Sequence, residues 1–231
     1  RDPGYREVKN EGILSYLREE NDYFDSVMNP HKAQTEALFE ELKGRVKEDD
    51  ESVPWQEGAF EYRWAFRKGD QYRVWYYRPR SDDPYSSDGW TVLLDENIEA
   101  DGKDYFKLGT VSVSPNGKYL AYSADTNGSE RFTVLVKNLE TGEMTNDQVK
   151  ETSGEVVWNE LSTAFATVKV SEEWRPYKVI LKKIGCRPER LLFEEKKTSF
   201  FVHIYATTSS KYMVIRSADH VTAEAYVVPR S

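Results

Sequence analysis

Three histidines and one cysteine are the residues of this sequence that could serve as bases, nucleophiles or metal ligands. They are His31, Cys186, His203 and His220, and they are scattered along the chain. A serine hydrolase of the α/β type needs a G-x-S-x-G turn followed by Asp and His, and this motif is missing. Zinc and calcium patterns such as C-x-x-C, H-E-x-x-H and D-x-D-x-D-G are missing too. We therefore expect no catalytic, cofactor-binding or metal-binding residue in this stretch.

Two glycine-containing tripeptides resemble functional motifs. Asn116-Gly117-Lys118 lacks the spacing of a phosphate-binding G-x-x-x-x-G-K-[ST] loop and fits a hairpin turn. Asn127-Gly128-Ser129 matches a glycosylation signal, but we interpret it as another hairpin turn. Cys186 follows Gly185 in a predicted loop with no base close in sequence, so we interpret it as an ordinary free thiol.

Clusters of carboxylates are the remaining candidates. They lie at residues 48–51, at Glu172-Glu173 and at Glu194-Glu195. Together they could attract a cationic peptide through long-range electrostatics. The alternative is that each cluster is a solvated loop or strand edge that discourages aggregation, and the sequence favours this second interpretation.

Composition and charge argue against two classes of partner. The chain is 39% hydrophobic and 31% charged, which is typical of a globular protein. Its longest apolar run, residues 200–206, is far shorter than the roughly 18 residues that a membrane span needs. The net charge of −8 disfavours nucleic acids, because phosphate binding needs clustered Lys and Arg. We expect neither a membrane nor a nucleic acid as partner.

The cysteine count points to a compartment. A single cysteine cannot form an intramolecular disulfide, and no signal peptide is visible, so we expect a cytoplasmic protein. The chain begins with Arg1 rather than Met. We therefore expect that it is preceded by a further segment.

The first part of the chain has helical periodicity. Apolar residues recur every three or four positions from Asn10 to Met28, and again from Ala33 to Val46. Asn29-Pro30 between them is predicted to supply the N-cap and first-turn proline of the second helix. We expect the two helices to pack as a hairpin. Residues 47–54, rich in carboxylates and ending in a proline, are expected to connect this N-terminal helical extension, residues 1–54, to the rest.

Beyond residue 54 the apolar period changes to two, and the segments repeat. Residues 116–122 have counterparts at 160–166 and 209–215, at offsets of about 45 and 48. Residues 132–136 match 177–181, again 45 residues on, and 225–228 follow. An earlier, more divergent unit carries an insertion near residues 81–88.

A repeat of this length with about four short strands predicts β-propeller blades. The blades are expected at about 55–109, 110–153 and 154–199, with a partial one at 200–231. The predicted fold is thus mainly β with an N-terminal α-helical arm and an incomplete propeller of about three and a half blades. Since this number closes no ring and an open stack exposes strand edges, we expect the chain to be a piece of a larger protein.

Short motifs spread over the whole chain resemble one family. The chain resembles the N-terminal part of the oligopeptidase B (protease II) group in the prolyl oligopeptidase family of serine peptidases. The motifs are residues 13–21 (ILSYLREEN), 138–142 (NLETG), 175–179 (RPYKV), 192–196 (LFEEK) and 207–212 (TTSSKY).

The resemblance implies a cytoplasmic peptidase that cleaves short peptides after Arg or Lys. It implies a seven-bladed propeller that acts as a scaffold and substrate-size filter for a C-terminal α/β-hydrolase domain, which carries the catalytic residues and is absent from this chain. The partners it implies are that domain and short basic peptides. One departure from the pattern lies at residues 159–162, where related blades have a glycine or asparagine turn. The geometry of this hairpin is therefore open.

A non-enzymatic binding module is the alternative hypothesis. In that case, a partner or a second copy would complete the exposed blades.

Overall fold

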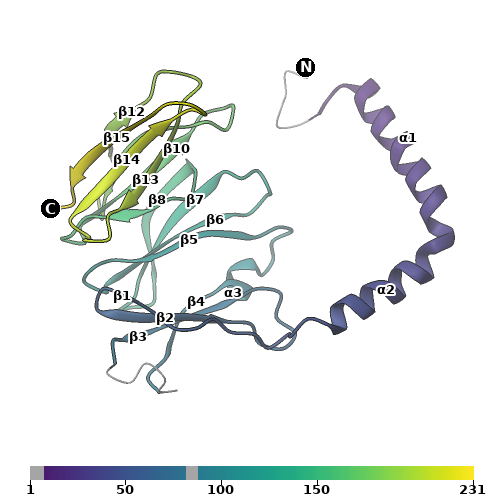
Figure 1. Ribbon diagram of the computed structural model, residues 1–231, viewed down its shortest axis with the longest axis horizontal. Coiled ribbons are helices and arrows are strands. Elements are labelled where there is room, and N and C mark those ends of the chain that lie inside the picture. The colour runs from purple at the N-terminus through teal and green to yellow at the C-terminus, as the bar shows by residue number, and fades with distance from the viewer. Residues whose placement is uncertain (1–7, 82–87) are drawn as a thin grey trace. The chain divides into compact units, whose positions relative to one another are not determined.

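The chain divides into two units in the computed structural model, which describes residues 8–81 and 88–231 (Figure 1). One unit ends at Glu48 and the other runs from Asp49 to Ser231, so the division comes before the predicted boundary at residue 54. The reason is that the connector joins the first sheet. Ser52 N–H donates to the Trp64 carbonyl at 2.9 Å, and the Asp50 carbonyl accepts from Phe66 N–H at 2.7 Å. The interior of the predicted insertion at 81–88 lies outside the described residues.

The N-terminal unit consists of α1 (Glu11–Met28), a 3₁₀ turn (Asn29–His31) and α2 (Lys32–Gly44). The predicted start of the first helix is confirmed, since Asn10 Oδ1 accepts from the backbone N–H of Gly12 at 2.9 Å. The prediction that Asn29 caps the second helix is wrong. Asn29 has helical backbone angles and donates its N–H to the Asp25 carbonyl, so its backbone continues α1.

The predicted helical hairpin is also wrong. Neither α1 nor α2 contains a buried residue, so their apolar stripes do not pack on each other. The helices follow one another along the chain through the 3₁₀ turn (Figure 1). A proline is tolerated in the first turn of a helix, so Pro30 allows the helical path to continue instead of reversing it.

The second unit is built from antiparallel strands in consecutive groups (Figure 1). The first sheet has the order β1 (Trp55–Glu57), β2 (Phe60–Ala65), β3 (Val74–Pro79), β4 (Thr91–Asp95). The short helix α3 (Glu96–Ala100) follows it. The last sheet contains β13 (Phe201–Ala206), β14 (Tyr212–Ala218) and β15 (Ala223–Pro229).

An eight-stranded sheet between them consists of two groups. The first group is β5 (Lys107–Val113), β6 (Tyr119–Asp125), β7 (Phe132–Asn138) and β8 (Met144–Thr152). The second is β9 (Val157–Trp158), β10 (Ala164–Val170), β11 (Pro176–Lys183) and β12 (Glu189–Glu194). The groups are paired through Thr152 and Lys169. Strand β5 begins at Lys107, slightly before the expected start of the second blade at residue 110.

The hairpin that opens the later groups has the same geometry each time. In each one, a left-handed residue donates its N–H to the carbonyl three residues earlier. The left-handed residues are Gly117, Ser162 and Ser210, with φ of 73°, 59° and 59°. The departure at residues 159–162 therefore leaves the turn unchanged. Asn159 holds it, because its Oδ1 accepts from the N–H groups of Thr163 and Ala164 at 2.8 and 2.9 Å.

The apolar core lies between neighbouring groups rather than inside any one of them. The first two groups share the buried residues Tyr62, Leu93, Leu94, Leu120 and Tyr122. The cluster between the second and third groups is Ala121, Val134, Val136, Val149, Trp158, Phe165 and Ile180. The cluster between the third and fourth is Val157, Ala166, Val168, Val179, Val202, Ile204, Met213 and Ile215. Each group thus buries its faces against the next one, as repeat units do.

The contact between the first two groups predicts a difference between two glycines. Gly117 has φ of +73°, and a Cβ there would lie 2.5 Å from Phe60 Cζ. Gly58 has φ of +60° with nothing within 4 Å. We expect Gly117→Ala to lower the free energy of unfolding by about 2–3 kcal/mol, from backbone strain and overpacking. The matched Gly58→Ala should cost about 1 kcal/mol, from strain alone. Urea unfolding measures both, and equal losses would contradict the Phe60 contact.

Candidate functional site

The histidines that the sequence singled out lie on separate elements. His31 ends the 3₁₀ turn, His203 lies on β13, and His220 lies in the loop before β15. His203 Nδ1 is 2.7 Å from Glu155 Oε1, and the other oxygen of Glu155 accepts from Ile204 N–H at 3.1 Å. The pair therefore links the segment before β9 to the last sheet. Within residues 8–81 and 88–231, no three His, Cys, Asp or Glu side chains are arranged to hold a metal ion.

Cys186 lies in the turn between β11 and β12. Its carbonyl accepts from Lys182 Nζ, and that ammonium is 3.4 Å from Asp147. The side chains of Lys182 and Asp147 are both 6% exposed, and Asp147 also accepts from Gly185 N–H at 2.9 Å. These contacts hold the turn in place and involve the backbone of Cys186 rather than its thiol.

The three carboxylate clusters lie in separate segments of the chain. Several of their carboxylates form ion pairs or hydrogen bonds with neighbouring side chains. Glu51 pairs with Arg63 at 2.6 Å, and Glu194 with Lys178 at 3.4 Å. Glu173 accepts from the Ser171 hydroxyl at 3.0 Å. These partners give the carboxylates structural roles in the loops and strands where they lie.

Glu195 is held where the third group leads into the fourth. Its Oε2 accepts from the Ser217 hydroxyl at 2.6 Å, and its Oε1 from Lys197 N–H at 2.8 Å. The Ser217 hydrogen bond is the main cause that lowers the pKa of Glu195 below its usual value, against the opposing effect of burial.

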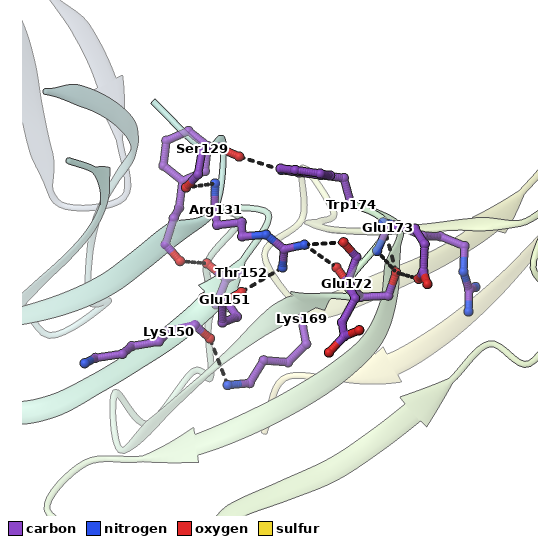
Figure 2. Close-up of polar contacts among 12 residues, drawn as sticks. Ser129, Arg131, Lys150, Glu151, Thr152, Lys169, Glu172, Glu173 and Trp174 are labelled. Carbon is purple, nitrogen blue, oxygen red and sulfur yellow. Dashed lines mark hydrogen bonds and ion pairs between the residues drawn. The ribbon is translucent and has the colours of Figure 1, made fainter. Parts of the chain in front are cut away.

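Arg131 is the residue that the sequence analysis missed. Its Nη2 donates to the carbonyls of Ser171 and Glu172 at 2.7 and 2.8 Å, and its Nη1 donates to Glu151 at 2.7 Å (Figure 2). The guanidinium also lies over the Trp174 ring, 4.8 Å from its centroid. The side chain is only 5% exposed. Arg131 therefore ties the loop before β7 in the second group to the loop before β11 in the third.

Arg175 repeats this arrangement one group later. It precedes β11 as Arg131 precedes β7, and its Nη1 donates to the carbonyls of Lys197 and Phe200 at 3.2 Å. Each arginine follows a left-handed residue, Glu130 or Trp174, with φ of 57° and 60°. The two are 44 residues apart instead of 45, because the loop before β11 is one residue shorter. A comparison of the repeats that allowed for loops of unequal length could have found both arginines.

An open hollow of about 490 Å³ lies beside Arg131 and is the candidate binding site of this chain. It is lined by Gly128, Ser129, Glu130, Phe132, Ser153, Val170, Trp174 and Pro176. The two loops that Arg131 holds together thus form much of its walls. Its lining has aromatic and aliphatic surface, one carboxylate and hydroxyl groups, but no histidine or cysteine. The chemistry it supports is binding rather than bond breaking.

None of the helices in the described part of the chain is both long and apolar enough to cross a membrane.

Comparison with protein families identifies one match over the whole chain. A family model described as "Prolyl oligopeptidase, N-terminal beta-propeller domain" matches residues 1–231. The chain is similar to dipeptidyl aminopeptidase BI of Pseudoxanthomonas mexicana, with 33% identity over 96% of this chain and 32% of that protein. It is also similar to Protease 2 of Moraxella lacunata, with 29% identity over 95% of this chain and 32% of that protein.

Solved structures agree. Oligopeptidase B from Leishmania major has a TM-score of 0.89 and 25% identity, over 96% of this chain and 31% of that one. Oligopeptidase B from Trypanosoma brucei, in a closed form with covalently bound antipain, has a TM-score of 0.87 and 26% identity, over 100% of this chain and 32% of that one. The chain thus spans about a third of the length of these relatives. The predicted fold, a partial β-propeller with a helical N-terminal arm, is confirmed.

The Arg131 contacts predict a loss of stability on a conservative change. Arg131→Lys retains the charge but cannot reach two carbonyls and a carboxylate at once, since Lys lacks the planar fork of donors. We expect the free energy of unfolding to fall by about 2 kcal/mol. Lys150→Gln, at a neighbouring exposed position, should change it by less than about 0.5 kcal/mol. Thermal and urea unfolding measure both, and equal effects would contradict the role of Arg131.

The Glu195 contact predicts a pH-dependent contribution to stability. Because its pKa is lowered in the folded state, Glu195 stabilises the fold above the unfolded value near 4.5, and this contribution is lost as pH falls through the folded pKa. Ser217→Ala should raise the pKa of Glu195 and cost about 1 kcal/mol at pH 7, with a difference that shrinks at low pH. Carboxyl NMR titration and unfolding from pH 3 to 7 check this. A difference independent of pH would contradict it, and Ser209→Ala is the control.

Proposed function

The chain belongs to the prolyl oligopeptidase family as part of its N-terminal β-propeller domain, and we propose that it is the scaffold and access filter of a serine peptidase that cleaves short peptides after Arg or Lys. The resemblance seen in the sequence is confirmed at the level of the family. The family consists of peptidases, so the parent protein is a hydrolase. The preference for Arg and Lys rests on the resemblance to the oligopeptidase B group.

The observation that carries the proposal is the stacking of strand groups. Each group buries its apolar faces against its neighbours, so the unit extends by adding groups around an axis. A ring of such blades leaves a narrow axial channel, which a short unfolded peptide can enter and a folded protein cannot. The candidate residues in this chain have structural contacts instead of an acid–base arrangement. The proposal therefore assigns bond cleavage to a C-terminal α/β-hydrolase domain as partner.

The proposal includes a location. The single cysteine, Cys186, supports a reducing compartment such as the cytoplasm. The ligands that the proposal assigns to the parent enzyme are short basic peptides.

The proposal is tested on the whole gene product that contains this chain. We expect it to hydrolyse a tripeptide nitroanilide ending in Arg or Lys and to leave the one ending in Glu intact. A peptide of about 40 residues with one Arg site should be cleaved at least about tenfold more slowly than a six-residue peptide with the same site, because entry through the propeller limits it. Arg131→Lys loosens the link between two groups. It should therefore bring the cleavage rates of the long and the short peptide closer to each other.

Each part of the proposal can fail separately. A gene product without hydrolytic activity would overturn the assignment as a peptidase. Cleavage after other residues would overturn the basic preference. Equal rates for long and short peptides, with Arg131→Lys behaving as the unchanged protein, would overturn the access filter.

A further inference from the structure

We propose that the hollow beside Arg131 binds the side chain of a Lys or Arg residue in an extended peptide. This inference rests on the proposed function, which already gives basic peptides as the ligands, and adds a place in this chain where they bind. The site lies wholly within this chain, between the loop before β7 and the loop before β11. The apolar residues of its lining match the aliphatic stem of such a side chain, and its carboxylate matches the cationic head.

The walls of the hollow provide an apolar surface for the stem. Phe132, Val170, Trp174 and Pro176 contribute two aromatic rings and two aliphatic groups. Lys and Arg bury their methylene stems along apolar surfaces while the charged head stays in water. A hollow that is open to solvent, with apolar walls, suits this division.

The aromatic wall is held in place before any ligand binds. Trp174 Nε1–H donates to the Ser129 carbonyl, and the Arg131 guanidinium lies against the indole ring (Figure 2). Trp174 and Glu130 both have left-handed backbones, which is uncommon for residues other than glycine and occurs where surrounding contacts determine it. A preformed wall lowers the ordering cost of binding.

A hydroxyl in the lining lacks a partner. Ser153 lines the hollow, and its Oγ is buried without a hydrogen bond to any residue that the structure describes. Buried hydroxyls are normally hydrogen-bonded, so one without a partner needs an explanation. Because this oxygen is closed off from solvent, the backbone carbonyl of a bound peptide accepts from it only after the side chains that cover it shift.

Charge selects the kind of side chain. Glu130 is the charged residue among those that line the hollow. It pairs with Lys107 at 3.5 Å, but both side chains are exposed, at 71% and 49%, so the pair is weak and can exchange for a ligand cation. The Nη1 and Nη2 groups of Arg131 are already engaged by Glu151 and two carbonyls, so its charge is paired within the chain. A cationic head is therefore favoured at the rim and an anionic one is disfavoured.

Titration with peptides, followed by NMR, tests the inference on the whole gene product that contains this chain. The probe is acetyl-Gly-Lys-Gly-amide, and the readout is the indole N–H signal of Trp174, assigned by its loss in Trp174→Phe. We expect saturable shifts with millimolar affinity. A norleucine peptide, which has a stem without the charge, should bind at least about threefold more weakly, as should the lysine peptide to Glu130→Gln.

Two further variants make the result specific. Ser153→Ala should weaken binding about threefold without lowering the free energy of unfolding, because its buried hydroxyl has no partner to lose. Glu172→Gln is the matched control, since Glu172 lies in the same loop as Trp174 but does not line the hollow. It should leave the affinity unchanged.

Three results would overturn the inference. They are the absence of a Trp174 shift, equal binding of the norleucine peptide, and equal losses in Glu130→Gln and Glu172→Gln. The second would indicate an apolar site and the third unspecific attraction by surface carboxylates. None of these results depends on hydrolysis, so they do not bear on the peptidase assignment.

Discussion

Burial of one strand group's face against the next is the constraint on which the second unit depends. Among the residues that the structure describes, the apolar clusters are shared between neighbouring groups, because a single sheet can cover its apolar side chains only with a neighbour. Trp158 illustrates this. It is 2% exposed, packs in the cluster between the second and third groups, and donates its indole N–H to the Ser112 carbonyl of β5 at 3.1 Å. The third group is thereby joined to the second by packing and by a hydrogen bond.

Polar contacts between loops fix how successive groups are aligned. Asn116 N–H donates to Ser162 Oγ at 3.0 Å, which joins the turns of the second and third groups. Arg230 donates to the carbonyls of Trp158 and Ser210 at 2.8 Å, which joins the third and fourth. Arg131 makes the corresponding link between the loops before β7 and β11. Apolar packing has no direction, whereas these hydrogen bonds are directional and therefore set the alignment.

The candidate site follows from these links. The hollow exists because two loops from neighbouring groups are held side by side, and its aromatic wall is fixed by the same arginine that joins them. Residues that stabilise the stack thus also shape the site. In the proposed function, the contribution of this chain is therefore geometric, through the arrangement of blades and through surfaces that a peptide can contact.

The sequence by itself determined the strand periodicity, the repeated turns, the first helix and the family, because these depend on residues close in the chain or on motifs in a fixed order. Tertiary structure decided the rest. The prediction of a helical hairpin was wrong because amphipathic periodicity does not specify what covers the apolar face. Arg131 and the hollow were missed because their partners, from Glu151 to Pro176, lie 20 to 45 residues further along the chain. Only the packing of one blade on the next brings such residues together.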